Sequence, residues 1–150
     1  MPALFYHVTQ SPVEEVVASL LPRALAQGWK VELRGTDAER MDWLDQRLWL
    51  EGDESFLPHG MAGGPHDALQ PVLLTVSPAP AGRDAIMTID GAEVDPAEVG
   101  ATQRVWILFD GRDERAVGRA RAQWKALTAA GATAQYWSEE SGRWEKKAER

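Results

Sequence analysis

The hydrophobic positions of this chain switch repeatedly between the two-residue period of strands and the 3.6-residue period of helices. Residues 3–8 form a short apolar run rich in aromatic and β-branched types, which predicts a buried strand. An amphipathic helix is predicted next, with Ser11 as its cap, Glu14 completing a capping box and Gly28 ending it. Its apolar stripe consists of Val13, Val16, Val17, Leu20, Leu21 and Ala24.

The following segment repeats this order. Residues 29–34 alternate apolar and polar types, which predicts a second strand. Thr36 and Glu39 frame a second capping box, so we expect a helix that runs to about Leu50. A β-α-β-α order favours an α/β domain with a parallel sheet, because the connecting helices carry the chain back to the same end of each strand.

The second half of the chain continues in the same manner after a loop-like stretch at 51–71. We expect residues 90–100, which are rich in acidic types, to lie on the surface. Residues 139–150 are charged, and we expect them to fray. No repeat and no domain boundary is visible. The remaining predicted elements are strands at 72–76, 85–89, 105–109 and 133–137, and a long helix at 113–130 that ends at Gly131.

Composition and charge exclude several classes of protein. The 150 residues include no cysteine, so disulfide scaffolds, zinc fingers and iron–sulfur clusters are excluded. A net charge of −7 argues against direct binding of nucleic acid, which depends on a basic surface. No apolar run approaches the roughly 18 residues of a membrane span, and the first residues lack the basic region of a signal peptide. We therefore expect a cytoplasmic protein without a membrane partner.

The residues that could carry catalysis or hold a cofactor do not form a recognised arrangement. The turn at 9–12 has no glycine to admit a pyrophosphate, and Pro65 blocks a phosphate-binding helix start after the glycines at 60–64. His59 and His66 share one loop, but their spacing does not supply the three or four converging ligands of a metal site. We expect no catalytic residue, no metal and no cofactor.

The predicted helix at 36–50 carries more apolar surface than docking on a sheet requires. One stripe, formed by Met41, Leu44 and Leu48, suffices for docking. The additional apolar residues form either a partner-binding patch or a surface covered by a loop or by the C-terminal segment. They are Trp43, Trp49, Leu50, Phe56, Leu57 and Pro58.

The last predicted helix is an electrostatic exception. Residues 112–131 carry five basic and two acidic side chains, a net charge of +3, which leaves −10 for the rest of the chain. Arg121 and Lys125 lie four residues apart at the border of the apolar stripe, beside Trp124. Two cations next to an aromatic ring suit an acidic peptide that ends in an apolar residue. The helix dipole alone also favours basic residues in this half of a helix.

Two segments at a specific spacing resemble the chi subunit of bacterial DNA polymerase III holoenzyme: Leu-Asp-Gln-Arg-Leu-Trp at 44–49 and Glu-Ser-Phe-Leu-Pro-His at 54–59. Phe5-Tyr6 and the helical segment 122–131 fit this family in the same order, so the resemblance covers residues 3 to about 138. It implies a chi-like domain at 1–138 with a three-layer, Rossmann-like α/β/α fold, followed by a charged C-terminal tail at 139–150. It also implies a non-catalytic accessory subunit of the clamp loader.

The resemblance further implies two partners. One is the acidic C-terminal tail of the single-stranded-DNA-binding protein, and Arg121, Trp124 and Lys125 match the helix that binds it. The other is the psi subunit of the clamp loader, which the family meets where this chain has Trp49 and Phe56-Leu57-Pro58.

This chain departs from the family at two positions of the implied tail-binding helix. Trp124 stands where the family commonly has tyrosine, and the uncharged Val117 stands where a further basic residue is expected. Arg115 and Arg119 are the candidates to replace that charge. Two alternative functions remain open: a small nucleotide-binding α/β enzyme, and a plain interaction domain that uses Trp43, Trp49 and Phe56.

Overall fold

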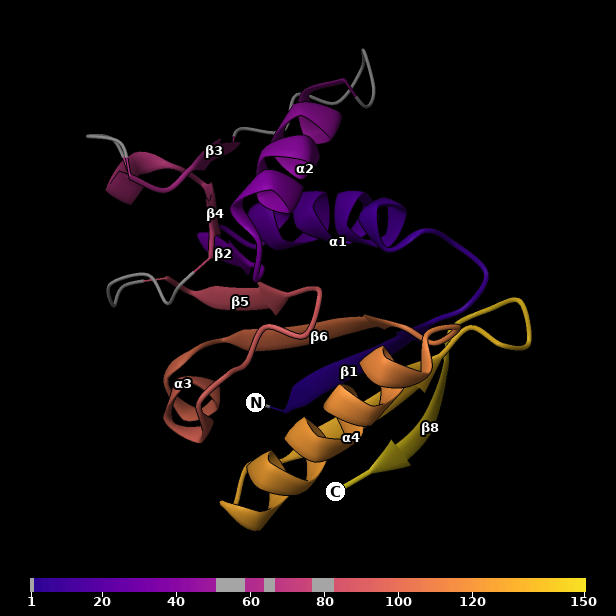
Figure 1. Ribbon diagram of the computed structural model, residues 1–150. Helices are drawn as coiled ribbons and strands as arrows, with labels where there is room; N and C mark the ends of the chain where they lie inside the picture. The colour runs from indigo at the N-terminus through magenta and orange to yellow at the C-terminus, as the bar shows by residue number, and fades with distance from the viewer. Residues whose placement is uncertain (1, 51–58, 64–66, 77–82) are drawn as a thin grey trace.

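One sheet of eight strands organises the computed structural model, which describes residues 2–50, 59–63, 67–76 and 83–150 (Figure 1). The strand order is β3-β4-β2-β5-β6-β1-β7-β8, and every neighbouring pair is parallel except β7 and β8. The strands are β1 (Ala3–Val8), β2 (Val31–Arg34), β3 (His59–Met61), β4 (Val72–Thr75), β5 (Ala85–Thr88), β6 (Arg104–Asp110), β7 (Ala134–Ser138) and β8 (Glu145–Glu149).

Helices cover both faces of this sheet. α1 (Val13–Ala26) and α2 (Ala38–Leu50) pack on one face, and α3 (Pro96–Ala101) and α4 (Glu114–Ala129) pack on the other, each over its own buried apolar cluster (Figure 1). A short 3-10 helix, Asp67–Leu69, precedes β4. The predicted three-layer α/β/α domain with a mostly parallel sheet is therefore confirmed. No helix among the described residues is long and apolar enough to cross a membrane.

The glycines predicted to end α1 and the last helix are confirmed, whereas the serine predicted to cap α1 is not. Gly28 and Gly131 adopt φ values of +82° and +92° just past the ends of α1 and α4, a conformation that glycine adopts without strain. The predicted Ser11 cap is wrong, because the N-cap of α1 is Pro12 and makes no side-chain cap. The amide and hydroxyl of Ser11 donate to Glu139 instead.

We expected the acidic segment 90–100 to lie on the surface, but part of it is buried. It contains α3, where Asp95 and Glu98 form a capping box and Pro96 occupies the start of the helix. Val94 and Val99 are buried in the apolar cluster under α4. The Asp-Pro-Ala-Glu signal is present in the sequence, so this helix was accessible to prediction.

β2 carries a buried ion cluster. Arg34 donates from Nε to Glu32 Oε2 and from Nη2 to Glu98 Oε2, both at 2.7 Å. Glu32 and Arg34 are each only 2% exposed, so the polar positions of this alternating strand are covered rather than solvated. The hydrogen bond from Arg34 holds the pKa of Glu98 below its usual value, against the effect of its partial burial.

The C-terminal segment is ordered rather than frayed. β8 pairs antiparallel with β7, and the ring of Trp144 packs 4.9 Å from that of Tyr6. At the start of the segment, Glu139 is 6% exposed, and its Oε1 accepts hydrogen bonds from the three consecutive backbone amides of residues 9–11. These contacts reach about 130 residues back along the chain, and a local charge pattern does not reveal them.

Candidate functional site

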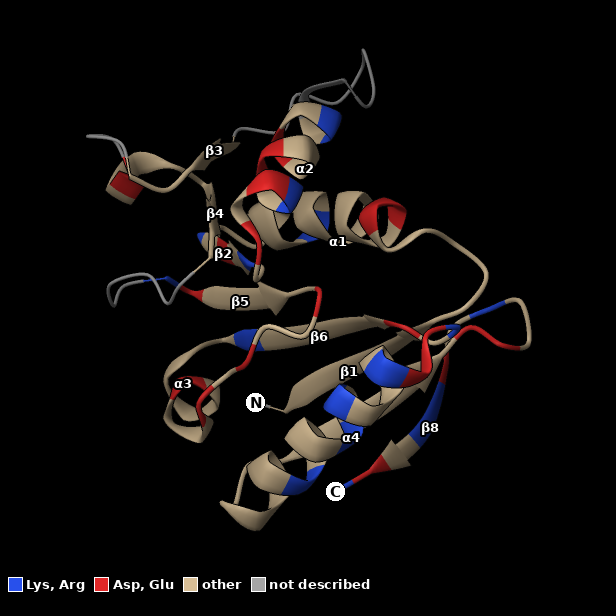
Figure 2. Cartoon of the chain, in the orientation of Figure 1, with Lys and Arg blue, Asp and Glu red and all other residues tan. Residues whose placement is uncertain are grey.

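A cavity of about 370 Å³ lies between α4 and the C-terminal strand. It combines an apolar interior with basic residues, and the basic residues of α4 and β8 are visible in Figure 2. All four residues predicted for the peptide-binding site, Val117, Arg121, Trp124 and Lys125, line it. The other lining residues are Phe5, Phe109, Ala120, Tyr136, Ala148, Glu149 and Arg150.

Aromatic rings form the interior of this cavity. Trp124 meets Phe5 edge-on at 5.2 Å between ring centroids and lies 6.2 Å from Tyr136. The ring centroid of Phe109 lies 6.0 Å from that of Tyr136. Phe5 and Phe109 point to the α4 face from neighbouring strands, because parallel pairing places Phe5 opposite Ile107 and side chains alternate along each strand. The sheet therefore fixes these rings, which are rigid partners for an apolar side chain.

The cations of α4 lie at the solvent side of these rings. Arg121 and Lys125 are exposed, and neither makes an ion pair within the part of the chain that the structure describes. Burial raises the pKa of Tyr136, Glu140 adds to this effect, and the positive charge of Arg121 opposes it. The arrangement presents unpaired positive charge next to an apolar cavity, which suits a carboxylate attached to an apolar group.

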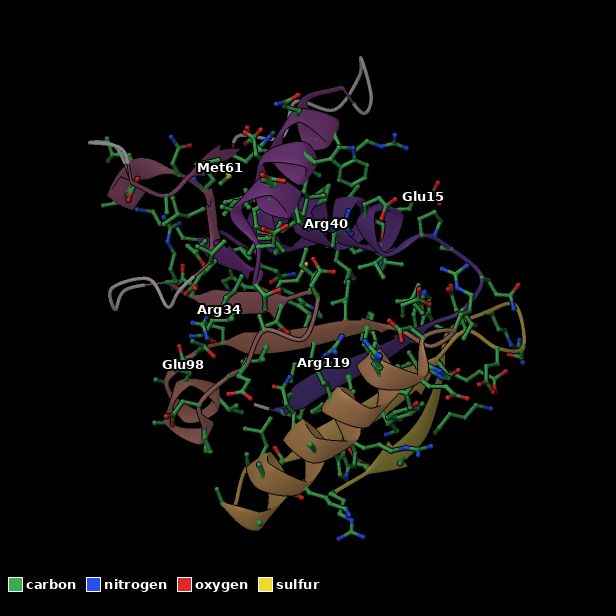
Figure 3. The ribbon with its side chains drawn as sticks, in the orientation of Figure 1. Glu15, Arg34, Arg40, Met61, Glu98 and Arg119 are labelled. Carbon is green, nitrogen blue, oxygen red and sulfur yellow. The ribbon has the colours of Figure 1, made fainter. Side chains whose placement is uncertain are left out.

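Neither residue predicted to replace the missing charge at Val117 lines this cavity. Arg115 is exposed elsewhere on α4. Arg119 extends toward the connection between β5 and α3 (Figure 3). Its side chain packs so close to Gly91 that a Cβ added to this glycine would lie 2.5 Å from the Nε atom of Arg119. Tyr136, Ala148 and Arg150 are among the lining residues that were not predicted for the site. Tyr136 belongs to a strand that was predicted, but Ala148 and Arg150 depend on β8, which was not.

The crevice in which a doubly wound sheet would bind a nucleotide is partly occupied by the chain's own groups. β1 and β6 are neighbours, and the helices that follow them lie on opposite faces, which is where such folds bind ligands. The amides after β1 are already hydrogen-bonded to the carboxylate of Glu139. The adjacent cavity of about 310 Å³ is lined by the carboxylates of Glu14, Asp90, Asp110 and Asp113 and by Arg40, Arg112 and Arg119. The chain's own carboxylate, that of Glu139, therefore occupies the amides after β1 that a phosphate would use.

The aromatic surface predicted on α2 is described only in part. Trp43 is 42% exposed, with the guanidinium groups of Arg40 and Arg47 at 4.8 and 5.8 Å from its ring. Trp49 lies in the last turn of α2, but its side chain is outside the described residues. Phe56, Leu57 and Pro58 are also outside them.

The histidine of the glycine-rich loop has a structural contact. The Nε2 atom of His59 lies 2.9 Å from the carbonyl oxygen of Asp45, and the ring is buried against α2. His66 lies outside the described residues. Among the residues that the structure describes, no three His, Asp or Glu side chains gather to hold a metal ion.

The strand order and the two helical layers define a Rossmann-like α/β domain, and its candidate site is the aromatic cavity between α4 and β8. Comparison with known sequences then identifies the family: the chain belongs to the DNA polymerase III chi subunit, HolC, family, which it matches over residues 1–135. Members of this family are non-catalytic accessory subunits of DNA polymerase III and act in DNA replication.

Two examples illustrate the individual proteins that are similar to this chain. A probable DNA polymerase III subunit chi from Rickettsia prowazekii (strain Madrid E) is 26% identical over 70 residues, which is 47% of this chain and 42% of that protein. The C-terminal domain of a possible DNA helicase from a Lactobacillus (strain WCFS1) superimposes with a TM-score of 0.52 and 14% identity, covering 73% of this chain and 74% of that one. The latter likeness concerns the fold alone.

Proposed function

We propose that this chain captures the acidic C-terminal tail of the single-stranded-DNA-binding protein in the cavity between α4 and β8. The observation that carries the proposal is the convergence of Arg121 and Lys125 on a cavity walled by Trp124, Phe5 and Tyr136. The apolar end of the tail fills the aromatic cavity, and the cations bind its terminal carboxylate and acidic side chains. In this function the chain works in the cytoplasm and does not bind DNA directly.

The physical character of the site sets the expected strength of binding. A short peptide that becomes ordered on binding loses conformational entropy, so we expect micromolar affinity, equivalent to about 8 kcal/mol. The cations of α4 are exposed, and the affinity therefore falls as salt screens their charges.

The proposal is tested by titrating wild type and variants with a synthetic acidic peptide that ends in an apolar residue. We expect Arg121→Ala to weaken binding about ten-fold or more, because it removes a charge-assisted contact from the rim of an apolar site. Lys125→Ala should weaken it several-fold. Arg115→Ala is the matched control, since it removes the same charge from the same helix outside the cavity. Wild-type affinity in both cavity variants would show that the peptide does not bind here.

We also propose that the chain links this tail to the clamp loader through a psi-like subunit bound at Trp49 and residues 56–58. α2 and α4 lie on opposite faces of the sheet, so a partner at the end of α2 leaves the cavity free (Figure 1). This arrangement allows both partners to bind at the same time.

Replacing Trp49 separates the two surfaces. We expect Trp49→Ala to reduce capture of a purified psi subunit at least ten-fold while leaving the peptide affinity unchanged, because tryptophan contributes strongly at interfaces. Trp43→Ala on the same helix is the control. If Trp43→Ala disrupts capture and Trp49→Ala does not, the partner binds a different face of α2.

A further inference from the structure

We propose that Arg150 is a third peptide-binding cation, which acts with Lys125 to select the acidic residues that precede the apolar end of the peptide. This inference rests on the proposed function and adds a residue beyond the segment that matches the family, which ends at residue 135.

Two adjacent cavities share the residues that carry this inference. The aromatic cavity is continued past the end of α4 by a second, more open cavity of about 610 Å³. Lys125 and Arg150 line both cavities, whereas Arg121 lines only the first. The two shared cations therefore stand at the junction, one from α4 and the other from the end of β8. The remaining residues of the second cavity are Thr128, Ala129, Gly131, Ala132 and Thr133.

The backbone of Arg150 is held in place by the sheet. Its N–H donates to the Ala134 carbonyl at 2.8 Å, and its carbonyl accepts from the Ala134 N–H at 2.9 Å. Ala148 pairs with Tyr136 in the same ladder. Because side chains alternate along a strand, Ala148 and Arg150 share the face that carries Ala134 and Tyr136, which is the face covered by α4. The small Ala148 leaves the aromatic cavity open, and Arg150 stands beside it.

The charges of this groove favour an acidic occupant. Arg121, Lys125 and Arg150 line it, and Glu149 is the one acidic residue among the described lining residues of the two cavities. The carboxylate of Glu149 is already bound by Gln135 and Lys146, and these contacts lower its pKa. A groove with a surplus of cations in a chain of net charge −7 attracts an anionic peptide locally.

The order of the cations along the groove gives the direction of the peptide. Its apolar C-terminal residue enters the aromatic cavity, and its terminal carboxylate reaches Arg121. The preceding acidic residues lie between Lys125 and Arg150, and the upstream chain leaves over the second cavity beside Gly131. Arg150 therefore recognises acidic side chains, whereas Arg121 recognises the end of the peptide.

The test is a double-mutant cycle between protein and peptide, measured by calorimetry. One peptide carries Asp and Glu before an apolar C-terminal residue, and in the second these are replaced by Asn and Gln. We expect Arg150→Gln to weaken the acidic peptide about three- to five-fold, the range of a partly exposed charge pair, and to leave the neutral peptide unaffected. Arg121→Ala should weaken both peptides. Arg143→Gln, whose side chain is 83% exposed outside both cavities, is the matched control and should change neither.

Each other outcome identifies the claim that fails. No binding of the acidic peptide to wild type overturns the proposed function itself. If wild type binds and Arg121→Ala weakens binding while Arg150→Gln behaves as Arg143→Gln, the role of Arg150 is wrong and the proposed function stands. Equal weakening of both peptides by Arg150→Gln assigns it to holding β8 instead. Competition by an oligothymidylate that depends on Arg150 would show that the groove selects nucleic acid.

Discussion

Replacing Arg34 with alanine is expected to lower the free energy of unfolding by about 3–5 kcal/mol, because it removes the guanidinium that donates two hydrogen bonds to the buried carboxylate of Glu32. Both residues are 2% exposed, and they share a hydrogen bond of 2.7 Å. Burial alone would lower the pKa of Arg34, but its hydrogen bonds to Glu98 and Glu32 outweigh that effect and raise it. Arg34 also joins α3 to β2 through Glu98, which lies 64 residues further along the chain (Figure 3).

Urea denaturation of matched variants measures this effect. Arg112→Ala is the control, since this arginine pairs with Asp110 at the surface with 54% of its side chain exposed, and its loss should cost little. Adding Glu32→Gln to Arg34→Ala should recover part of the stability, because the buried charge is removed and Thr75 still has an acceptor for its hydroxyl. A loss below about 1 kcal/mol for Arg34→Ala would show that the charge of Glu32 is compensated in the folded protein without Arg34.

The strand that carries the ion cluster was predictable from the sequence, whereas the burial of its charged side chains was not. Periodicity predicted the strand at 29–34, and β2 occupies 31–34. Such alternation normally marks a strand with one solvated side, whereas helices cover both faces of this parallel sheet. The polar side chains can be buried because Arg34 pairs both with Glu32 and with Glu98 of α3. That pairing depends on a tertiary contact that no local pattern contains.

The residues of the candidate site also fall into two groups, those that the sequence could bring together and one that only the tertiary structure adds. Val117, Trp124 and Lys125 lie four, three and four residues from Arg121 along the chain, so a helix alone brings them to one side, and the sequence was sufficient to group them. Arg150 joins them only because β8 adds to the edge of the sheet. The charged composition of 139–150 predicted fraying, but pairing of β8 with β7 and contacts with residues near the start of the chain hold this segment.

Glu139 helps to explain why the segment 139–150 is ordered rather than frayed. We expect Glu139→Ala to destabilise the protein by about 2–3 kcal/mol. Its Oε1 accepts from the amides of Thr9, Gln10 and Ser11 at 3.0, 2.7 and 3.0 Å. Charge-assisted hydrogen bonds contribute roughly 1.5–3 kcal/mol each when buried, but Gln10 is exposed and water can replace part of the loss. The negative charge also lies just before α1, where the helix dipole favours it.

Two further variants separate the anchoring of the segment from simple loss of charge. Glu139→Gln keeps one acceptor oxygen and should lose about half as much stability, whereas Glu140→Ala, with 61% of its side chain exposed, should lose little. Glu139→Ala should also accelerate amide exchange in β8 more than in β1, because β8 is the edge strand that Glu139 helps to tether. Since Arg150 follows β8, the same variant should weaken the acidic peptide more than the neutral one. Unchanged exchange in β8 would show that pairing with β7 alone holds Arg150 in the groove.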